Sequence, residues 1–179
     1  MKIRIALLAS AFLVSSVSAA DTAKAPPDVP AEVGPGPVTD SVCNGKLSGA
    51  VKADFNCTIT VTKKADGLVT FDVKPAAPVK GLKSFQPATF AIKGPLAVQT
   101  YTHRDLASGS STAQTTAGKK FSASGKVADR GDMEVQVQTM ERTSNRYPLA
   151  QVAVHAHLVP TDAKDASEIQ VDIQFEATW

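Results

Sequence analysis

The feature that most constrains this fold is the alternation of apolar and polar side chains along the sequence after residue 42. Between 168 and 178 every second side chain is apolar, in the order Ile169, Val171, Ile173, Phe175 and Ala177. Successive side chains of a β-strand point to opposite faces, so this spacing predicts a strand with one buried face and one solvated face. Such strands are typical of antiparallel sheets that cover one side of a core.

The same alternation predicts a series of further strands, over 55–63, 68–73, 84–92, 96–103, 119–127, 133–139 and 149–159. No amphipathic helix of three turns separates them, and parallel sheets need such long crossover connections. We therefore predict an all-β fold, an antiparallel β-sandwich of about eight or nine strands, with a closed antiparallel β-barrel as the alternative. The small polar residues of 106–118 predict a mobile loop.

The N-terminus has the features of an export signal. Lys2 and Arg4 precede an apolar run over 5–17, which is too short to span a bilayer as a helix. The small residues at 18–20 suit cleavage by a signal peptidase. We therefore predict that residues 1–20 are a secretion signal peptide, with a permanent N-terminal anchor as the alternative.

The next segment, residues 21–40, holds five of the eleven prolines of the chain. Proline lacks a backbone donor and fixes φ, so this segment cannot sustain a helix or a central strand. It also has few large apolar side chains to bury. We predict a flexible linker at 21–40, followed by a single β domain over 41–179.

The charge balance argues against a nucleic acid or an anionic membrane surface as partner. The chain has 19 basic and 17 acidic residues, but two of the basic residues, Lys2 and Arg4, belong to the predicted signal. Removing them leaves 17 of each sign, so the mature chain is formally neutral. A neutral chain has no overall attraction for polyanions.

The only two cysteines, Cys43 and Cys57, enclose thirteen residues. In an exported chain such a pair favours a disulfide. Redox catalysis usually uses a close C-x-x-C spacing, and a metal site would need further ligands that no nearby histidine supplies. We predict a structural disulfide, with two free buried thiols as the alternative.

The residues between the cysteines predict a hairpin in a specific register. If the two cysteines oppose each other, Gly45 faces Phe55 and Lys46 faces Asp54. The glycine leaves room for the aromatic ring, and the lysine meets an opposite charge across the strands. The turn then falls near Gly49, which can adopt the φ of a tight turn.

Three histidines, His103, His155 and His157, are candidate metal ligands. His155 and His157 are separated by one residue and therefore share a face of their predicted strand. Three histidines and a water form a known catalytic zinc arrangement, so a zinc-binding protein or zinc hydrolase is one alternative. The apolar residues of this strand lie on its other face, which equally predicts two solvent-exposed histidines without a ligand.

No other catalytic signature is present: the sequence contains no nucleophile elbow and no glycine-rich phosphate loop. We assign no catalytic residue and no cofactor apart from the zinc alternative. The tripeptide Arg130-Gly131-Asp132 resembles the cell-adhesion motif read by integrins, and it is also an ordinary turn composition.

The C-terminal strand, which ends at Trp179, resembles the last strand of bacterial outer-membrane β-barrels. It departs from that pattern at Ala177, where a tyrosine is common. Membrane barrels also carry aromatic girdles, whereas this chain is 6% aromatic. The resemblance implies a small outer-membrane β-barrel, or a lipid-binding barrel, as a further alternative, and only this alternative involves membrane contact.

These observations favour an exported protein, periplasmic, cell-surface or secreted, with a non-enzymatic binding or structural role. Its expected partner is a protein or an envelope component. The ligand cannot be inferred from the sequence.

Overall fold

The computed structural model describes residues 42–102, 104–124, 131–142, 148–162 and 164–178. The predicted signal peptide and linker lie outside these ranges. The described residues form strands, turns and bends and contain no helix. Accordingly, this part of the chain has no helix long and apolar enough to cross a membrane.

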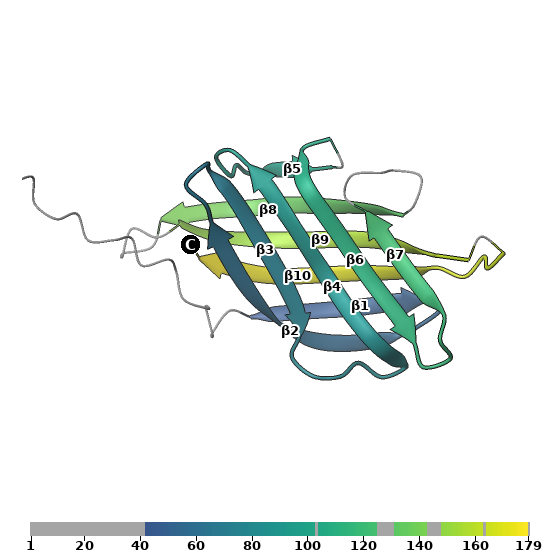
Figure 1. The fold of residues 1–179 in the computed structure, drawn as a ribbon. Helices are drawn as coiled ribbons and strands as arrows, with labels where there is room; N and C mark the ends of the chain where they lie inside the picture. The colour runs from purple at the N-terminus through teal and green to yellow at the C-terminus, as the bar shows by residue number, and fades with distance from the viewer. Residues whose placement is uncertain (1–41, 103, 125–130, 143–147, 163, 179) are drawn as a thin grey trace, which may run out of the picture. The chain divides into compact units, whose positions relative to one another are not determined.

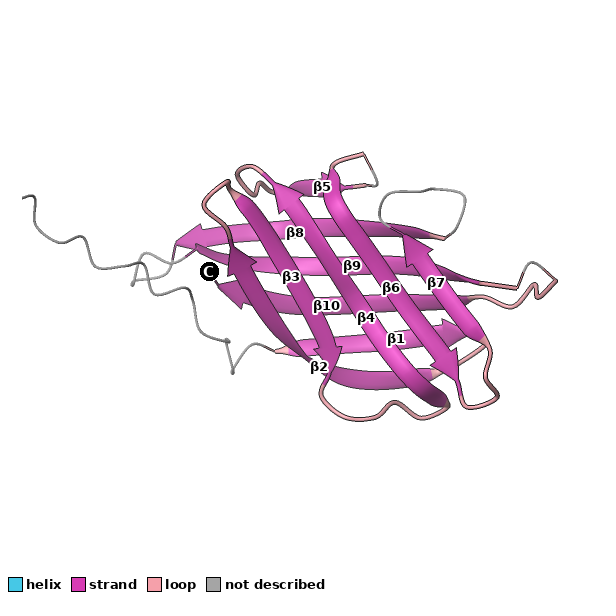
Figure 2. Ribbon diagram, in the orientation of Figure 1, coloured by secondary structure: helices cyan, strands magenta, loops and turns pink. Residues whose placement is uncertain are grey.

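Ten antiparallel strands make up the fold, as Figures 1 and 2 show. In chain order they are β1 (Cys43–Gly49), β2 (Ala53–Lys63), β3 (Leu68–Pro75), β4 (Leu82–Lys93), β5 (Gln99–Tyr101), β6 (Leu106–Thr115), β7 (Lys120–Ser124), β8 (Asp132–Arg142), β9 (Pro148–Pro160) and β10 (Ile169–Thr178). The all-β prediction is confirmed.

Of the two predicted architectures, the closed barrel is the one that the protein adopts. Eight strands pair in the cyclic order β10-β1-β2-β3-β4-β6-β7-β9, and β9 pairs with β10 to complete the ring. β8 pairs with β9, and β5 pairs with β8, as a branch beside the ring. The sandwich prediction fails because β2 is shared: residues 53–56 pair with β1, and residues 57–63 pair with β3.

The barrel still has two crossing layers, with β3, β4, β6 and β7 over β1, β8, β9 and β10 (Figure 1). The seam between β7 and β9 is short. Only Phe121↔Pro160 and Ser122↔Val159 pair there, and the backbone N–H of Thr161 adds a hydrogen bond to the Lys120 carbonyl.

Side chains fill the interior of the barrel. The buried apolar residues form one cluster, to which the inward positions of the strands contribute. Phe71 and Phe90 stack at its centre with ring centroids 4.8 Å apart, and both are fully buried. Of the described residues, only Val42 and Val98 are exposed large hydrophobics, so the outer surface is polar.

The loop predicted at 106–118 is wrong, because residues 106–115 form β6. The inward face of β6 carries small side chains, among them Ala113 and the fully buried Ser111, whose hydroxyl donates to the Gln86 carbonyl at 3.3 Å. Small inward residues and the irregular register with β4 weaken the apolar alternation that identifies a strand. The strand predicted at 96–103 shortens to β5.

The loop between β9 and β10 is held by an ion pair with the β6–β7 turn. Lys119 Nζ lies 2.7 Å from Asp165 Oδ2, and the backbone N–H and hydroxyl of Ser167 both donate to Asp165 Oδ1. These donors, the Lys119 ammonium first, hold the pKa of the Asp165 carboxyl well below its usual range.

Candidate functional site

The cysteine pair cross-links β1 and β2, the two strands of the first hairpin. Cys43 and Cys57 form a disulfide, and both are buried. The predicted register is confirmed, since Gly45 pairs with Phe55 and Lys46 pairs with Asp54. A Cβ atom at Gly45 would lie 2.1 Å from Cζ of Phe55, so the ring occupies the space that the glycine leaves.

The polar side chains of β8, β9, β10, β1 and the start of β2 form a continuous outer face. Strand pairing aligns five of them into a charged row that runs across all five strands. In spatial order the row is Glu134, His155, Asp172, Lys46 and Asp54. Directly opposed residues on neighbouring antiparallel strands lie close enough to interact, so each charge in this row neighbours the next.

Two further rows flank the charged row. On one side the aligned residues are Gln136, Ala153, Gln174, Asn44 and Asn56, four of which carry side-chain amides. On the other side they are Asp132, His157, Gln170 and Ser48. A side-chain amide both donates and accepts hydrogen bonds. The face therefore combines a row of amides with rows of charged groups.

The two histidines of this face are each paired with a carboxylate of their own. His155 Nδ1 lies 2.6 Å from Asp172 Oδ1. His157 Nε2 lies 2.9 Å from Glu168 Oε2, and its Nδ1 lies 3.7 Å from Asp132 Oδ1. The predicted exposed positions are confirmed, because His155 is exposed and His157 is half-exposed.

The predicted three-histidine zinc site is not tested as a set, because His103 lies outside the described residues. Within the described part of the chain, no group of three or more His, Cys, Asp or Glu side chains converges on one point. The carboxylates beside His157 lie on opposite ring nitrogens, so one ion cannot bridge them through that ring. The structure brings together two imidazole–carboxylate pairs.

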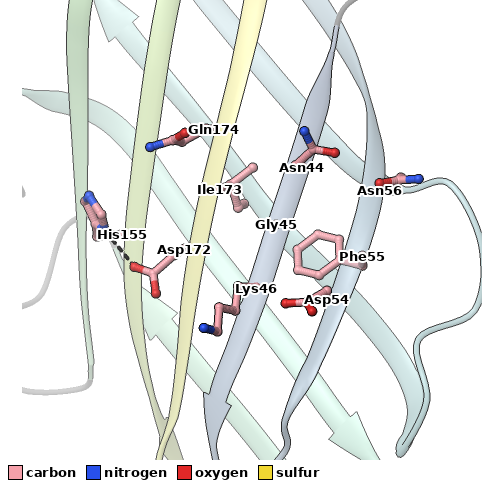
Figure 3. A pocket seen from close by; sticks show the side chains of 10 residues that line it. All are labelled: Asn44, Gly45, Lys46, Asp54, Phe55, Asn56, His155, Asp172, Ile173 and Gln174. Atoms are coloured by element: carbon pink, nitrogen blue, oxygen red, sulfur yellow. Dashed lines mark hydrogen bonds and ion pairs between the residues drawn. The ribbon is translucent and has the colours of Figure 1, made fainter.

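Three adjoining hollows lie on this face. The largest, an open groove of about 560 Å³, lies between the charged and amide rows over β9, β10, β1 and β2 (Figure 3). A second, of about 230 Å³, shares His155 and Asp172 with it and extends to β8. A third, also about 230 Å³, shares Asn44 and Gln174. The hollows open to solvent beside polar side chains, not into the barrel.

The charged side chains that the structure describes are segregated between this face and the rest of the surface. We call this outer side of β8, β9, β10, β1 and the start of β2 the acidic face. Its described charged side chains are the seven carboxylates Asp54, Asp132, Glu134, Glu141, Glu168, Asp172 and Glu176, and one cation, Lys46, which together give −6 with neutral histidines. The remaining described side chains include eleven Lys and Arg against five Asp, which gives +6.

Of the adhesion-like tripeptide Arg130-Gly131-Asp132, the structure describes Gly131 and Asp132, and Arg130 lies outside the described residues. Asp132 begins β8 on the acidic face, and Gly131 is buried at the β7–β9 seam. Gly131 has φ +74°, and a Cβ there would lie 2.3 Å from the His157 carbonyl oxygen and 2.8 Å from that of Ser122. Close packing of backbone accounts for this glycine.

The sequence pattern identifies the two histidines but not the carboxylates that pair with them. Asp172 on β10 and Glu134 on β8 are both outward residues that pair with His155 on β9. Alternation alone places each on the outer face of its strand. Their meeting at His155 depends on the pairing of β9 with both strands, for which the sequence carries no local signal.

A scan against protein-family models, a search of curated proteins and a search of solved structures each gave no match.

Proposed function

We propose that this chain is an exported, non-enzymatic binding protein of the cell envelope or extracellular space, and that its ligand binds on the acidic face. The observation that carries the proposal is the position of the hollows. Three adjoining hollows lie on one outer face between rows of amides and charges, and a further one of about 340 Å³ lies at its edge, between the start of β2 and residues 76–80. The barrel interior is filled with packed side chains. A lipid carrier would instead need an open apolar interior.

Export is supported by the sequence of residues 1–20 and by the Cys43–Cys57 disulfide, because disulfides persist in oxidising compartments. The polar outer surface favours an aqueous location over the membrane-barrel alternative, which requires an outward apolar band. Expression of the full chain in a bacterium tests export directly. We expect the periplasmic fraction to contain protein shortened by about twenty residues, with no free thiol. Full-length cytoplasmic protein with two reactive thiols would contradict export.

Binding on the acidic face is tested by an NMR titration of the isotopically labelled mature chain. The probes are soluble peptidoglycan fragments, lipopolysaccharide and purified envelope proteins, each added separately. We expect at least one probe to shift backbone amides of β8, β9, β10 and β1, and to leave those of β3 and β4 unchanged as an internal control. Shifts confined to β3, β4 and β6, or no shifts with any probe, would contradict the proposal.

Zinc binding is the second candidate, favoured by the placement of His155 and His157 on one face beside carboxylates. Imidazole and carboxylate groups are both zinc ligands. A calorimetric zinc titration of the wild type and of the His155→Ala/His157→Ala variant tests it. Micromolar or tighter binding that the variant loses would support a zinc site, and equal binding by both proteins would exclude these histidines.

A further inference from the structure

The acidic face has unpaired carboxylates at both ends of its charged row. Glu134 and Asp54 form no ion pair or hydrogen bond with another described side chain, and Lys46, although it lies between Asp172 and Asp54, is within 4.0 Å of neither carboxylate. Exposed carboxylates without partners remain available to an incoming cation. The internal ion pairs therefore do not use up the negative charge of this face.

The spacing of the charged row matches a peptide in the polyproline II conformation, which has three residues per turn and a rise of about 3.1 Å per residue, so that its side chains recur on one face about every 9.3 Å. Neighbouring strands lie about 4.8 Å apart, so the carboxylates on β8, β10 and β2, which occupy every second strand of the charged row, recur about every 9.6 Å. The amide row runs parallel to the charged row, on the opposite side of the groove. Side-chain amides can pair with the N–H and C=O groups of a peptide backbone, while carboxylates pair with its ammonium or guanidinium groups.

We propose, on the basis of the binding function proposed above, that the acidic face binds an extended segment of a protein rich in lysine or arginine. The charge of −6 that the described side chains give this face repels phosphate-bearing partners and attracts polycations. The amide row supplies contacts to the peptide main chain that a simple counter-ion would not use. A cationic peptide is an occupant that would use both the charged row and the amide row.

The test uses a fluorescent twelve-residue peptide with lysine at every third position and serine elsewhere, and the negative probe has glutamate in place of each lysine. Binding is measured by anisotropy at low and at high salt. We expect the lysine peptide to bind and the glutamate peptide not to bind. Affinity for the lysine peptide should fall about tenfold between 50 and 300 mM salt, because the contacts are between exposed charges. Salt-independent binding would overturn the proposal.

Two variants with the same change in net charge locate the site. Glu134→Gln/Asp172→Asn removes two carboxylates from the acidic face, and Asp66→Asn/Asp162→Asn removes two from loops elsewhere. Asp66 and Asp162 only accept backbone N–H groups, which asparagine can also do. We expect about tenfold weaker binding for the first variant, from two exposed pairs, and less than twofold for the second. Equal losses would overturn the assignment to this face. Circular dichroism checks that both variants fold.

Two other outcomes separate this inference from the proposed function. If the lysine peptide does not bind but an envelope component shifts the same strands in the NMR titration, the cationic ligand is wrong and the binding function stands. The occupant would instead be a second copy of this chain if sedimentation shows self-association that the Glu134→Gln/Asp172→Asn variant abolishes. That result would overturn the peptide proposal.

Discussion

Replacing Gly45 by alanine should destabilise the barrel, although strand propensity alone predicts the opposite. Glycine inside a strand is about 0.5–1 kcal/mol less favourable than alanine, so an unhindered substitution would stabilise. Here the new Cβ would lie 2.1 Å from Cζ of Phe55 and 2.6 Å from its Cε atoms. Carbon atoms in contact prefer about 3.5 Å, so the ring would have to retreat by about 1.4 Å.

The surroundings of Phe55 resist that movement. The side chain is 8% exposed, and its ring packs edge-on against Phe85 with centroids 5.1 Å apart. Inserting a methyl group into a packed site costs about 1–3 kcal/mol, from which the gain in strand propensity must be subtracted. We expect Gly45→Ala to lower the free energy of unfolding by about 1–2 kcal/mol, measured by urea denaturation with an unchanged m-value.

A double-mutant cycle with Phe55→Leu tests the cause. Leucine lacks the ring atoms that clash, so the alanine should cost less in its presence. We expect the double variant to be more stable than the sum of the single effects predicts by about 1 kcal/mol. A stabilising Gly45→Ala, or effects that add within about 0.5 kcal/mol, would show that the ring does not restrict this position, and would refute the reasoning.

Three further variants test other parts of the barrel. Replacing Cys43 and Cys57 together by alanine should lower the free energy of unfolding by about 3 kcal/mol, as the chain-entropy model gives for a loop of about 15 residues, and urea denaturation that shows no loss would contradict this role. Gly131→Ala should cost about 2 kcal/mol or more in the same assay, because backbone carbonyl oxygens cannot move away from the new Cβ, whereas wild-type stability would rule out the close packing. Asp165→Asn should be less stable than the wild type at neutral pH. The difference should shrink as the pH falls below the ordinary range of the carboxyl and should vanish below its lowered pKa, because protonation there breaks the pair with Lys119 in the wild type as well; a difference that does not shrink in acid would exclude the ion pair as its source.

The parts of the fold that the sequence predicts well are those set by neighbouring residues. The first hairpin is an example, because a short turn fixes which residues oppose each other and only one register places both cysteines together. Period-2 alternation likewise identifies β2, β3, β9 and β10 and the faces that they bury. In these strands large apolar side chains occupy nearly every inward position, so the pattern is strong.

The parts that the sequence does not predict depend on contacts between distant strands. β6 was missed because small residues, Gly109 opposite Phe90 and Ala113 opposite Phe85, take inward positions where partners on β4 provide the bulk. The choice between sandwich and barrel rests on the short seam of β7 with β9 and on the sharing of β2 between two layers. Neither feature changes the alternation within a single strand.

The acidic face shows how a chain with a net charge of only +2 can carry a strong local charge. Its carboxylates come from β2, β8, β10 and the residue before β10, and the sequence separates these segments by long stretches that contain lysines. The barrel order places β8, β9, β10, β1 and β2 side by side, whereas the lysine-bearing turns and β3 and β4 lie elsewhere. Net charge predicts no general attraction to polyanions, but it averages over this segregation. A partner that contacts only one face responds to the local charge of that face. The proposal of a cationic ligand therefore rests on the strand order, which brings the carboxylates together, rather than on the composition of the chain.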